Sequence, residues 1–317
     1  MGRRKSGRNV NGVILLDKPK HLSSNAALQQ VRRFFNANKA GHTGALDPLA
    51  TGWLPLCFGE ATKVSHYCLE ADKRYVVMAQ LGVRTTTSDA EGEVVAEAEV
   101  NVTEAQLQQV IGQFIGPQQQ SPSIYSALKH EGKPLYYYAR LGIEVPRKTR
   151  DIVIRAIDLL SFDGQRAELE VTCSKGTYIR TLVDDIGQQL GCGAHVAELR
   201  RTWIEGVEGQ LLTLEQVAEV AAQCNPEQGD YAALDALLAG NDAVVRQLPS
   251  VQLDNQAAQQ FMQGMPITLA DLVWPAESLL RVWRESDNAL LGVAVFDGQR
   301  LLPKRVMNDV ASIAQTD

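Results

Sequence analysis

Residues 41–63, GHTGALDPLATGWLPLCFGEATK, constrain the fold more than any other part of the chain. Glycines and prolines interrupt this run too densely for a helix. Glycine permits positive φ and close approach of the backbone, whereas proline fixes φ and removes a hydrogen-bond donor. The run is therefore expected to form a fixed loop. Asp47 lies in its middle, with His42, Thr43 and Thr51 near it in the sequence, so the loop presents a carboxylate among polar side chains.

Asp47 has an ordinary interpretation and a functional one. Asp-Pro pairs are common in turns, where the Asp side chain caps its own backbone. A carboxylate in a fixed loop also serves as a nucleophile, a base or an electrostatic stabiliser. A glycoside hydrolase would need a second carboxylate, and no neighbour of Asp47 in this loop supplies one. Asp47 is therefore expected to work alone or together with a cation and an aromatic ring.

The composition is that of an ordinary soluble globular protein. Its 317 residues are 45% hydrophobic and 21% charged, enough to bury a sizeable core in one large domain or two. No apolar run reaches the roughly 18 residues of a membrane span, and no apolar stretch follows the basic N-terminus as in a secretory signal. The five cysteines are irregularly spaced and lack a C-x-x-C, which favours a reduced, cytoplasmic compartment. The five histidines form no H-x-x-x-H pattern, so no protein-ligated metal is expected.

The net charge of −6 conceals a segregated distribution. Residues 205–317 hold 6 Lys and Arg against 16 Asp and Glu, whereas residues 1–204 hold 25 against 21. Two clusters of basic residues stand out, one made of Arg3, Arg4, Lys5, Arg8, Lys18, Lys20, Arg32 and Arg33, the other of Lys129, Lys133, Arg140, Arg147, Lys148 and Arg150. Such clusters are suited to a polyanion, although scattered solvated charges would give the same pattern.

The spacing of apolar residues predicts both strands and helices. Strands are predicted at 13–16, 75–81 and 169–173, and a hairpin at 290–306. Helices are predicted after 23–25, after capping boxes at 103–106 and 213–216, and at 179–190 and 254–263, where a glycine follows each. Arg180 falls in the first turn of the helix at 179–190, just beyond a strand end, which is a common place for a site residue.

Residues 117–150 differ from the rest of the chain. They contain four prolines, four tyrosines and six basic residues. Excursions of this length inside a domain are usually functional or disordered. The segment is predicted to be a long insertion that carries stacking and phosphate-binding groups.

Residues 41–63 resemble the catalytic signature of the TruB family of pseudouridine synthases. Further blocks resemble the same family in the same order, namely NGVILLDKPKHLSSN, DKRYVVMAQLGVRTTTSDAEG, PSIYSALKHEGKPLYYYARLGIEVPRKTR and CSKGTYIRTLVDDIGQQLGCGAHVAELRRT. Together the blocks span roughly residues 10–205. Trp53 departs from the pattern, since that position is usually smaller in the family, and the chain after 250 matches only loosely.

The resemblance implies isomerisation of uridine in RNA, in which the N1–C1′ bond is cut, the base turns, and a C5–C1′ bond forms. It implies that Asp47 is the nucleophile. Arg180 is the candidate to hold that carboxylate ionised, and Tyr75 to stack on the flipped-out base. The implied substrate-binding residues are His42, Tyr178, Leu199 and Lys18, with Asp89 and Arg140 as weaker matches.

The implied fold is α+β, the pseudouridine synthase fold, with a mixed, mostly antiparallel sheet flanked by helices. Residues 1–9 are expected to form a flexible basic arm. Residues 10–248 form the catalytic domain with an RNA-gripping insertion at about 117–150, and 249–317 form a small β-rich, PUA-like C-terminal domain. In the family this domain contacts the acceptor arm of tRNA, a contact that the acidity of the present domain leaves open.

The implied substrate is the uridine at position 55 in the T-loop of tRNA. The implied enzyme is a cytoplasmic monomer that needs no cofactor or metal and no membrane, guide RNA or protein partner. Two alternatives remain. In the first, the protein is a tRNA-folding chaperone that acts by binding alone. In the second, it is a synthase that depends on a guide RNA. The second is disfavoured because the long Lys-rich extensions of many eukaryotic relatives are missing from this sequence.

Overall fold

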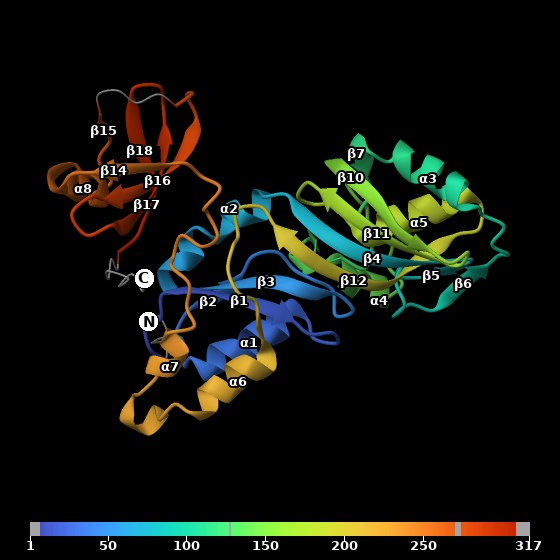
Figure 1. The fold of residues 1–317 in the computed structure, drawn as a ribbon, viewed down its shortest axis with the longest axis horizontal. Helices are drawn as coiled ribbons and strands as arrows, with labels where there is room; N and C mark the ends of the chain where they lie inside the picture. The colour runs from blue at the N-terminus through green and yellow to red at the C-terminus, as the bar shows by residue number, and fades with distance from the viewer. Residues whose placement is uncertain (1–6, 127, 270–273, 309–317) are drawn as a thin grey trace. The chain divides into compact units, whose positions relative to one another are not determined.

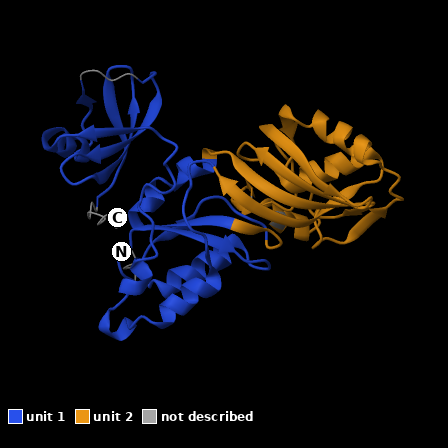
Figure 2. Ribbon diagram, in the orientation of Figure 1, with its two compact units in different colours: residues 1–47, 53–69, 205–317 blue, residues 48–52, 70–204 orange. Residues whose placement is uncertain are grey.

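The computed structural model describes residues 7–126, 128–269 and 274–308, so Arg3, Arg4 and Lys5 of the predicted basic arm lie outside the described residues (Figure 1). The chain divides into two compact units (Figure 2). Unit 1 comprises Met1–Asp47, Trp53–Leu69 and Glu205–Asp317, and unit 2 comprises Pro48–Gly52 and Glu70–Ile204. One boundary between the units therefore falls directly after Asp47.

A twisted sheet forms the centre of unit 2. Its strands follow the order β12-β4-β11-β10-β7, each antiparallel to its neighbour, and the first two residues of β3 join β12 in parallel. The bounds are β3 Thr51–Phe58, β4 Lys73–Leu81, β7 Gly116–Gln120, β10 Arg150–Phe162, β11 Arg166–Cys173 and β12 Ala194–Ile204. The mixed, mostly antiparallel sheet predicted from the sequence is confirmed.

Two helices, α3 (Glu104–Gln113) and α5 (Ile179–Leu190), lie beside each other against this sheet (Figure 1). Helix α3 begins at the predicted capping box of Thr103. Helix α5 buries the apolar face predicted for it and ends at Gly191, whose φ of 83° permits the turn. The smaller elements of the unit are β5 Val83–Thr85, β6 Val94–Glu97, β8 Lys129–His130, β9 Lys133–Pro134 and α4 Leu135–Arg140.

Unit 1 contains a second group of strands in the order β13-β1-β3, with β2 also paired to β3. Helix α1 begins at its predicted cap, where the Ser23 side chain accepts from the Ala26 N–H. Helix α6 begins at the predicted capping box of Thr213 and packs against α1. The bounds are β1 Gly12–Lys18, α1 Ser24–Phe34, β2 Ala40–His42, η1 Gly59–Lys63, α2 Ser65–Glu70, β13 Leu212–Thr213, α6 Leu214–Ala222, η2 Pro226–Gln228 and α7 Ala232–Asp235.

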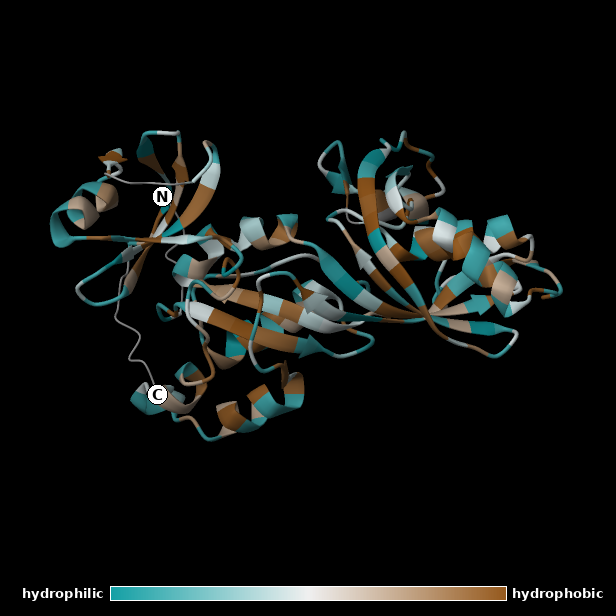
Figure 3. Cartoon of the chain, turned by 45° about the horizontal axis from the view of Figure 1, so that its top comes forward, coloured by the Kyte–Doolittle hydropathy of each residue, from teal (hydrophilic) through white to brown (hydrophobic). Residues whose placement is uncertain are grey.

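The residues from 250 onward form a separate five-stranded sheet in the order β14-β16-β17-β18-β15. Its core holds the helix residue Phe261 with Leu280 and Leu291 of neighbouring strands, all with no exposed surface. The hairpin predicted at 290–306 is confirmed by β17 and β18, and Figure 3 shows the apolar residues, in brown, along these strands. The bounds are β14 Ser250–Leu253, α8 Asn255–Met262, β15 Ile267–Thr268, β16 Ser278–Arg284, β17 Ala289–Phe296 and β18 Arg300–Val306.

The prediction that all of residues 41–63 form a loop is wrong. Only residues 43–50 do so, because β2 pairs in antiparallel register with β3, which is followed by a 3₁₀ helix. The continuous apolar stretch Leu54, Leu56 and Phe58 is fully buried, and its backbone groups need the hydrogen bonds of a sheet.

The predicted insertion is also shorter than expected at its start. Residues 117–120 belong to β7, paired with β10, so the excursion from the sheet runs from 121 to 149. Pro117 fits there because β7 is the last strand of the sheet, where a proline interrupts no further ladder. Among the described helices, none is long and apolar enough to cross a membrane.

Candidate active site

Asp47 lies in the loop between β2 and β3, partly exposed to solvent. The residue before it is held by both backbone groups. The Leu46 N–H donates to Ser24 Oγ at 2.7 Å, and this hydroxyl donates to the Leu46 carbonyl at 3.1 Å. After Asp47, the chain is anchored again because Leu49 and Ala50 are buried. The structure therefore fixes the backbone on both sides of Asp47, which keeps part of its surface exposed.

His42 and Lys18 also belong to unit 1. His42 ends β2, opposite Leu56 of β3. Lys18 ends β1 with no exposed surface, and its ammonium donates to the carbonyls of Pro19 at 2.8 Å and Leu22 at 2.7 Å. These bonds fix the turn that follows β1.

Tyr75 and Leu199 are brought to one face of the sheet in unit 2. Tyr75 on β4 is paired with Arg201 on β12, and Val77 two residues later is paired with Leu199. Directly paired residues point to the same side of a sheet, and so do residues two apart. Tyr75 and Leu199 are thus diagonal neighbours. Gly52 is paired with Arg201 on its other side, which brings the chain just after the Asp47 loop into register with Tyr75.

Arg180, in the first turn of α5, is buried in a network of acceptors. Its guanidinium lies 3.4 Å from the Asp89 carboxylate, and both side chains are 4% exposed. It also donates to the carbonyls of Thr87 and Tyr125, each at 3.0 Å. Asp89 is itself fixed, since its Oδ1 accepts from the Thr87 hydroxyl at 2.5 Å and from the Glu91 N–H at 3.1 Å. A planar cation held at several points has little freedom to reorganise.

Tyr178 is the residue that precedes α5. Its side chain makes no capping bond, but its backbone is bound by the side chain of Gln120, the last residue of β7. The Tyr178 N–H donates to Gln120 Oε1 at 2.7 Å, and Gln120 Nε2 donates to the Tyr178 carbonyl at 3.0 Å.

Several residues of the two predicted basic clusters are engaged within the protein. Arg8 forms an ion pair with Asp235 and lies over the Tyr231 ring at 4.1 Å. Arg32 donates to the Ala37 and Asn38 carbonyls. These two side chains therefore stabilise unit 1, which the sequence prediction of a phosphate-binding cluster did not anticipate.

The cluster of the insertion is more exposed. Lys129, Lys148 and Arg140 lie at the surface. Lys133 is also exposed, and its ammonium donates to the Tyr137 hydroxyl at 3.1 Å. Arg147 donates to the Pro122 carbonyl at 3.2 Å and thereby ties the two ends of the insertion together.

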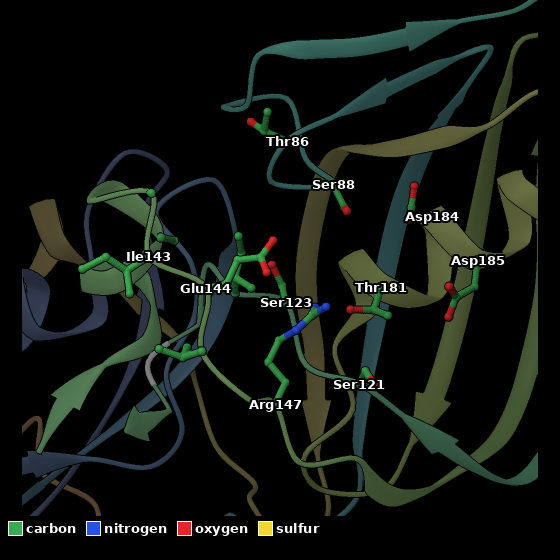
Figure 4. Close-up of a pocket in the computed structure, with 14 residues that line it drawn as sticks. Thr86, Ser88, Ser121, Ser123, Ile143, Glu144, Arg147, Thr181, Asp184 and Asp185 are labelled. Carbon is green, nitrogen blue, oxygen red and sulfur yellow. The ribbon is translucent and has the colours of Figure 1, made fainter. Parts of the chain in front are cut away.

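A cavity of about 690 Å³ separates the insertion from α5 within unit 2 (Figure 4). Its wall combines apolar side chains of the insertion with hydroxyls and carboxylates from three parts of the unit, including Ser88, Ser121, Ser123, Glu144, Thr181, Asp184 and Asp185. None of the seven predicted site residues lines it, although Ser88 and Thr181 adjoin Asp89 and Arg180 in the chain. Partial burial and then the nearby Asp184 carboxylate raise the pKa of Asp185 to about 6, whereas Arg84 opposes the shift.

The remaining reactive groups are the cysteine thiols and the side chains that could bind a metal. Cys57, Cys68, Cys173 and Cys192 are buried and form no disulfide within the described residues. Burial raises the pKa of Cys173 to about 12, with a smaller opposing effect from Thr177. Such thiols are unreactive at neutral pH. Within the ranges that the structure describes, no three His, Cys, Asp or Glu side chains are grouped as a metal site.

Comparison with known families accounts for nearly the whole chain. Residues 32–179 match the N-terminal domain of the TruB family of pseudouridylate synthases, residues 180–246 the C-terminal domain of tRNA pseudouridylate synthase B, and residues 249–307 the C-terminal part of pseudouridine synthase II TruB. A tRNA pseudouridine synthase B of Idiomarina loihiensis is 55% identical over 96% of each chain. The chain belongs to the TruB family.

Further similar proteins support the membership of this enzyme in the TruB family. A tRNA pseudouridine synthase B of Vibrio atlanticus is 51% identical over 97% of each chain. The fold is shared with a chain of a Cbf5–Nop10–Gar1 complex, with a TM-score of 0.72 and 26% identity over 93% of this chain and 84% of the other. A chain of an H/ACA RNP bound to a substrate RNA containing 2′-deoxyuridine gives a TM-score of 0.73 at 22% identity, over 98% and 92% of the two chains. The enzyme is an isomerase that converts uridine to pseudouridine in tRNA.

Three residues that position this site were missed from the sequence. Ser24 was interpreted only as a helix cap, yet Ser23 is the cap and Ser24 holds the Asp47 loop. Gln120 was placed within the insertion without a role. Arg201 was not singled out within its block, yet this charged residue is only 1% exposed and is paired directly with Tyr75. No local pattern distinguishes these residues, since each acts on a segment distant in the sequence.

Proposed function

We propose that this TruB-family enzyme acts on the uridine at position 55 in the T-loop of tRNA, with Asp47 as its nucleophile. The observation that carries the proposal is the way the Asp47 loop is fixed. Ser24 binds both backbone groups of Leu46, and Asp47, the next residue, keeps part of its surface exposed. A reacting group on a preorganised backbone loses little freedom when the substrate binds.

The other proposed roles follow from the surroundings of each residue. Tyr75 is half-buried at one end of a sheet face, suited to stacking on a base. Flipping a uridine out of its stack costs a few kcal/mol, and stacking on an aromatic ring returns about 1–3 kcal/mol. Leu199, its diagonal neighbour, and Tyr178 at the start of α5 complete the substrate pocket. His42 takes part in the flipping step, and Lys18 supports the turn beside the site.

Arg180 is proposed to hold Asp47 ionised and oriented. A nearby guanidinium favours the charged form of a carboxylate, and this guanidinium is itself held by Asp89 and two carbonyls. In the reaction the N1–C1′ bond breaks and the base turns before C5 bonds to C1′. The proton of C5 is then released and N1 gains one, so no oxidant, metal or cofactor is required.

The substrate proposal also covers binding. The exposed lysines of the insertion bind the phosphates of the T-arm, and the enzyme acts as a cytoplasmic monomer. Purified protein alone, incubated with an unmodified tRNA transcript, tests this. We expect one pseudouridine, mapped at position 55 by carbodiimide modification and primer extension. A product at another uridine would overturn the proposed position without affecting the isomerase assignment.

Two alternatives are that the enzyme depends on a guide RNA and that it also acts as a tRNA-folding chaperone. The similar chains in the H/ACA and Cbf5 assemblies raise the question of a guide RNA, whereas the curated relatives that match along the full chain are tRNA enzymes by name. Activity of the purified protein without any guide decides the question. A chaperone function coexists with catalysis if an Asp47→Asn variant still accelerates tRNA refolding.

A further inference from the structure

The insertion of unit 2 leaves the sheet and returns to it at a single pair of residues. Strand β7 ends at Gln120, strand β10 begins at Arg150, and these two residues are direct partners in the antiparallel ladder. The excursion from 121 to 149 is thus closed at its base by this pair. Gln120 is 5% exposed, so its amide needs internal hydrogen-bond partners.

The side chains of Gln120 and Arg150 both lie beside the segment that leads into α5. The Gln120 amide binds the N–H and the carbonyl of Tyr178 at 2.7 and 3.0 Å, in the manner of one more rung of a sheet. This pairing fixes the orientation of the amide, since only its oxygen accepts and only its nitrogen donates. Arg150 lies beside the same segment, where a Cβ placed on Gly176 would come 3.7 Å from its guanidinium.

A second link joins the insertion to the helix itself. The Tyr125 carbonyl, five residues beyond Gln120, accepts from the Arg180 guanidinium at 3.0 Å. The carbonyl of Tyr178 meanwhile accepts the Leu182 N–H at 3.1 Å, the first intrahelical bond of α5. The start of α5 is therefore bound to the insertion and its base at Tyr178 and at Arg180, two residues apart at the first turn of the helix.

We infer that Gln120 is a positioning residue that couples the insertion to the reaction site. When tRNA phosphates bind the basic side chains of the insertion, the base of the insertion determines where Tyr178 and Arg180 stand. Gln120 itself touches no substrate. The inference rests on the proposed function, which assigns Tyr178 and Arg180 to the site.

The alternative is that Gln120 only stabilises the fold. A purely structural bond alters the free energy of unfolding but leaves the rate of the folded enzyme unchanged. A positioning bond alters the chemical step itself, because displacement of a reacting group by about 1 Å costs up to about 100-fold in rate. The two roles are separated by the single-turnover rate at saturating enzyme, measured beside tRNA affinity and urea unfolding.

The test compares Gln120→Leu, which removes both bonds at similar volume, with Gln119→Leu as the matched control. Gln119 is the exposed neighbour on the same strand, and its amide bonds only to the exposed Asp151 at 3.1 Å in the described structure. We expect Gln120→Leu to lose about 10- to 100-fold in single-turnover rate with tRNA affinity retained, and Gln119→Leu to match the wild type. A wild-type rate for folded Gln120→Leu would overturn the inference.

Gln120→Glu keeps the experiment decisive if Gln120→Leu does not fold. It retains an acceptor for the Tyr178 N–H and loses the donor to the Tyr178 carbonyl. If Gln120→Leu folds, a single-turnover rate of Gln120→Glu between those of the wild type and Gln120→Leu supports positioning. If Gln120→Leu is unfolded, a reduced rate of Gln120→Glu supports it. An unaltered rate of Gln120→Glu contradicts it in either case. Asp47→Asn is assayed in parallel. If that variant is active, the proposed function fails; if it is inactive while the Gln120 variants are unaffected, only the present inference fails.

Discussion

The Arg180 guanidinium and the Asp89 carboxylate form a buried ion pair at 3.4 Å, with each side chain 4% exposed. Removing one partner of such a pair leaves a desolvated charge, which costs far more than the loss of a surface pair. Nη1 of the guanidinium faces both the Asp89 carboxylate and the Thr87 carbonyl, whereas Nη2 donates to the Tyr125 carbonyl, so the pair helps to set the plane of the guanidinium. The position of the cation proposed to hold Asp47 thus depends on Asp89.

Asp89→Asn is expected to slow the single-turnover rate by at least about tenfold and to destabilise the fold by about 1–3 kcal/mol. Arg155→Gln is the control, since it breaks an ion pair with Asp72 in which Arg155 is 53% exposed. That change should alter stability by less than about 0.5 kcal/mol and leave the rate unaltered. Rapid-quench assays and urea titrations measure both. Equal rates for Asp89→Asn and the wild type would show that Arg180 is held without Asp89.

Gly52→Ala is expected to destabilise the protein by about 1–3 kcal/mol or more. Gly52 has a φ of 98°, and an added Cβ would lie 2.1 Å from the Arg201 carbonyl, where β3 meets β12. Gly41→Ala, in the same glycine-rich run, has nothing within 4 Å of the added atom and no positive φ. Thermal unfolding should therefore separate the two substitutions, and equal melting temperatures would contradict the close approach of the strands.

These cases show which parts of the fold were predictable. Strand β4, helix α5 with its terminal Gly191, and the capping boxes of α3 and α6 followed from local spacing and capping chemistry, which act within a few residues. The β2–β3 pairing could not be predicted in this way. The glycines and prolines of residues 41–63 are unfavourable for a strand, and β3 forms because it pairs with neighbouring strands. Tertiary pairing overrides local propensity in such a segment.

The candidate site also contains residues that the sequence indicates and residues that only the fold reveals. Asp47, Tyr75 and Arg180 were selected because their motifs carry chemistry in the sequence. Ser24 and Gln120 fix the backbone beside Asp47 and at Tyr178, because they bind backbone atoms of Leu46 and Tyr178, which are 22 and 58 positions away. A side chain that binds a distant backbone leaves no pattern in one sequence, so only the fold reveals it.

Asp185 gives a prediction for pH. Its pKa is raised from 3.8 to about 6 in the folded protein, chiefly by burial, so the native state holds this proton more tightly than the unfolded chain. The favourable contribution is complete below about pH 3.8 and is lost as pH rises through about 6. Asp185→Asn should therefore stabilise the protein by on the order of 1 kcal/mol above about pH 7, after allowance for partial exposure. The gain should shrink as pH falls towards 4, and a pH-independent gain in urea titrations would contradict the shift.

Binding of tRNA is expected to weaken as salt increases, because each phosphate contact releases counterions. Lys148→Gln, at an exposed position of the insertion, should lower the slope of log K against log salt by about 1. Arg300→Gln is the control, since Arg300 lies in the acidic C-terminal part and pairs with Asp297 at 3.3 Å. Filter binding at several salt concentrations measures both slopes. An unaltered slope for Lys148→Gln would remove that lysine from the phosphate contacts.

The role of Asp47 is tested most directly by tritium release from C5-labelled uridine in a T-arm RNA. Wild-type protein should release the label and retain the base on the RNA, whereas release of free uracil would indicate a glycosidase. Asp47→Asn, which keeps the size of the side chain and removes its charge, should bind the RNA with unaltered affinity and release no tritium. Full tritium release by folded Asp47→Asn would contradict the assignment of Asp47 as the nucleophile.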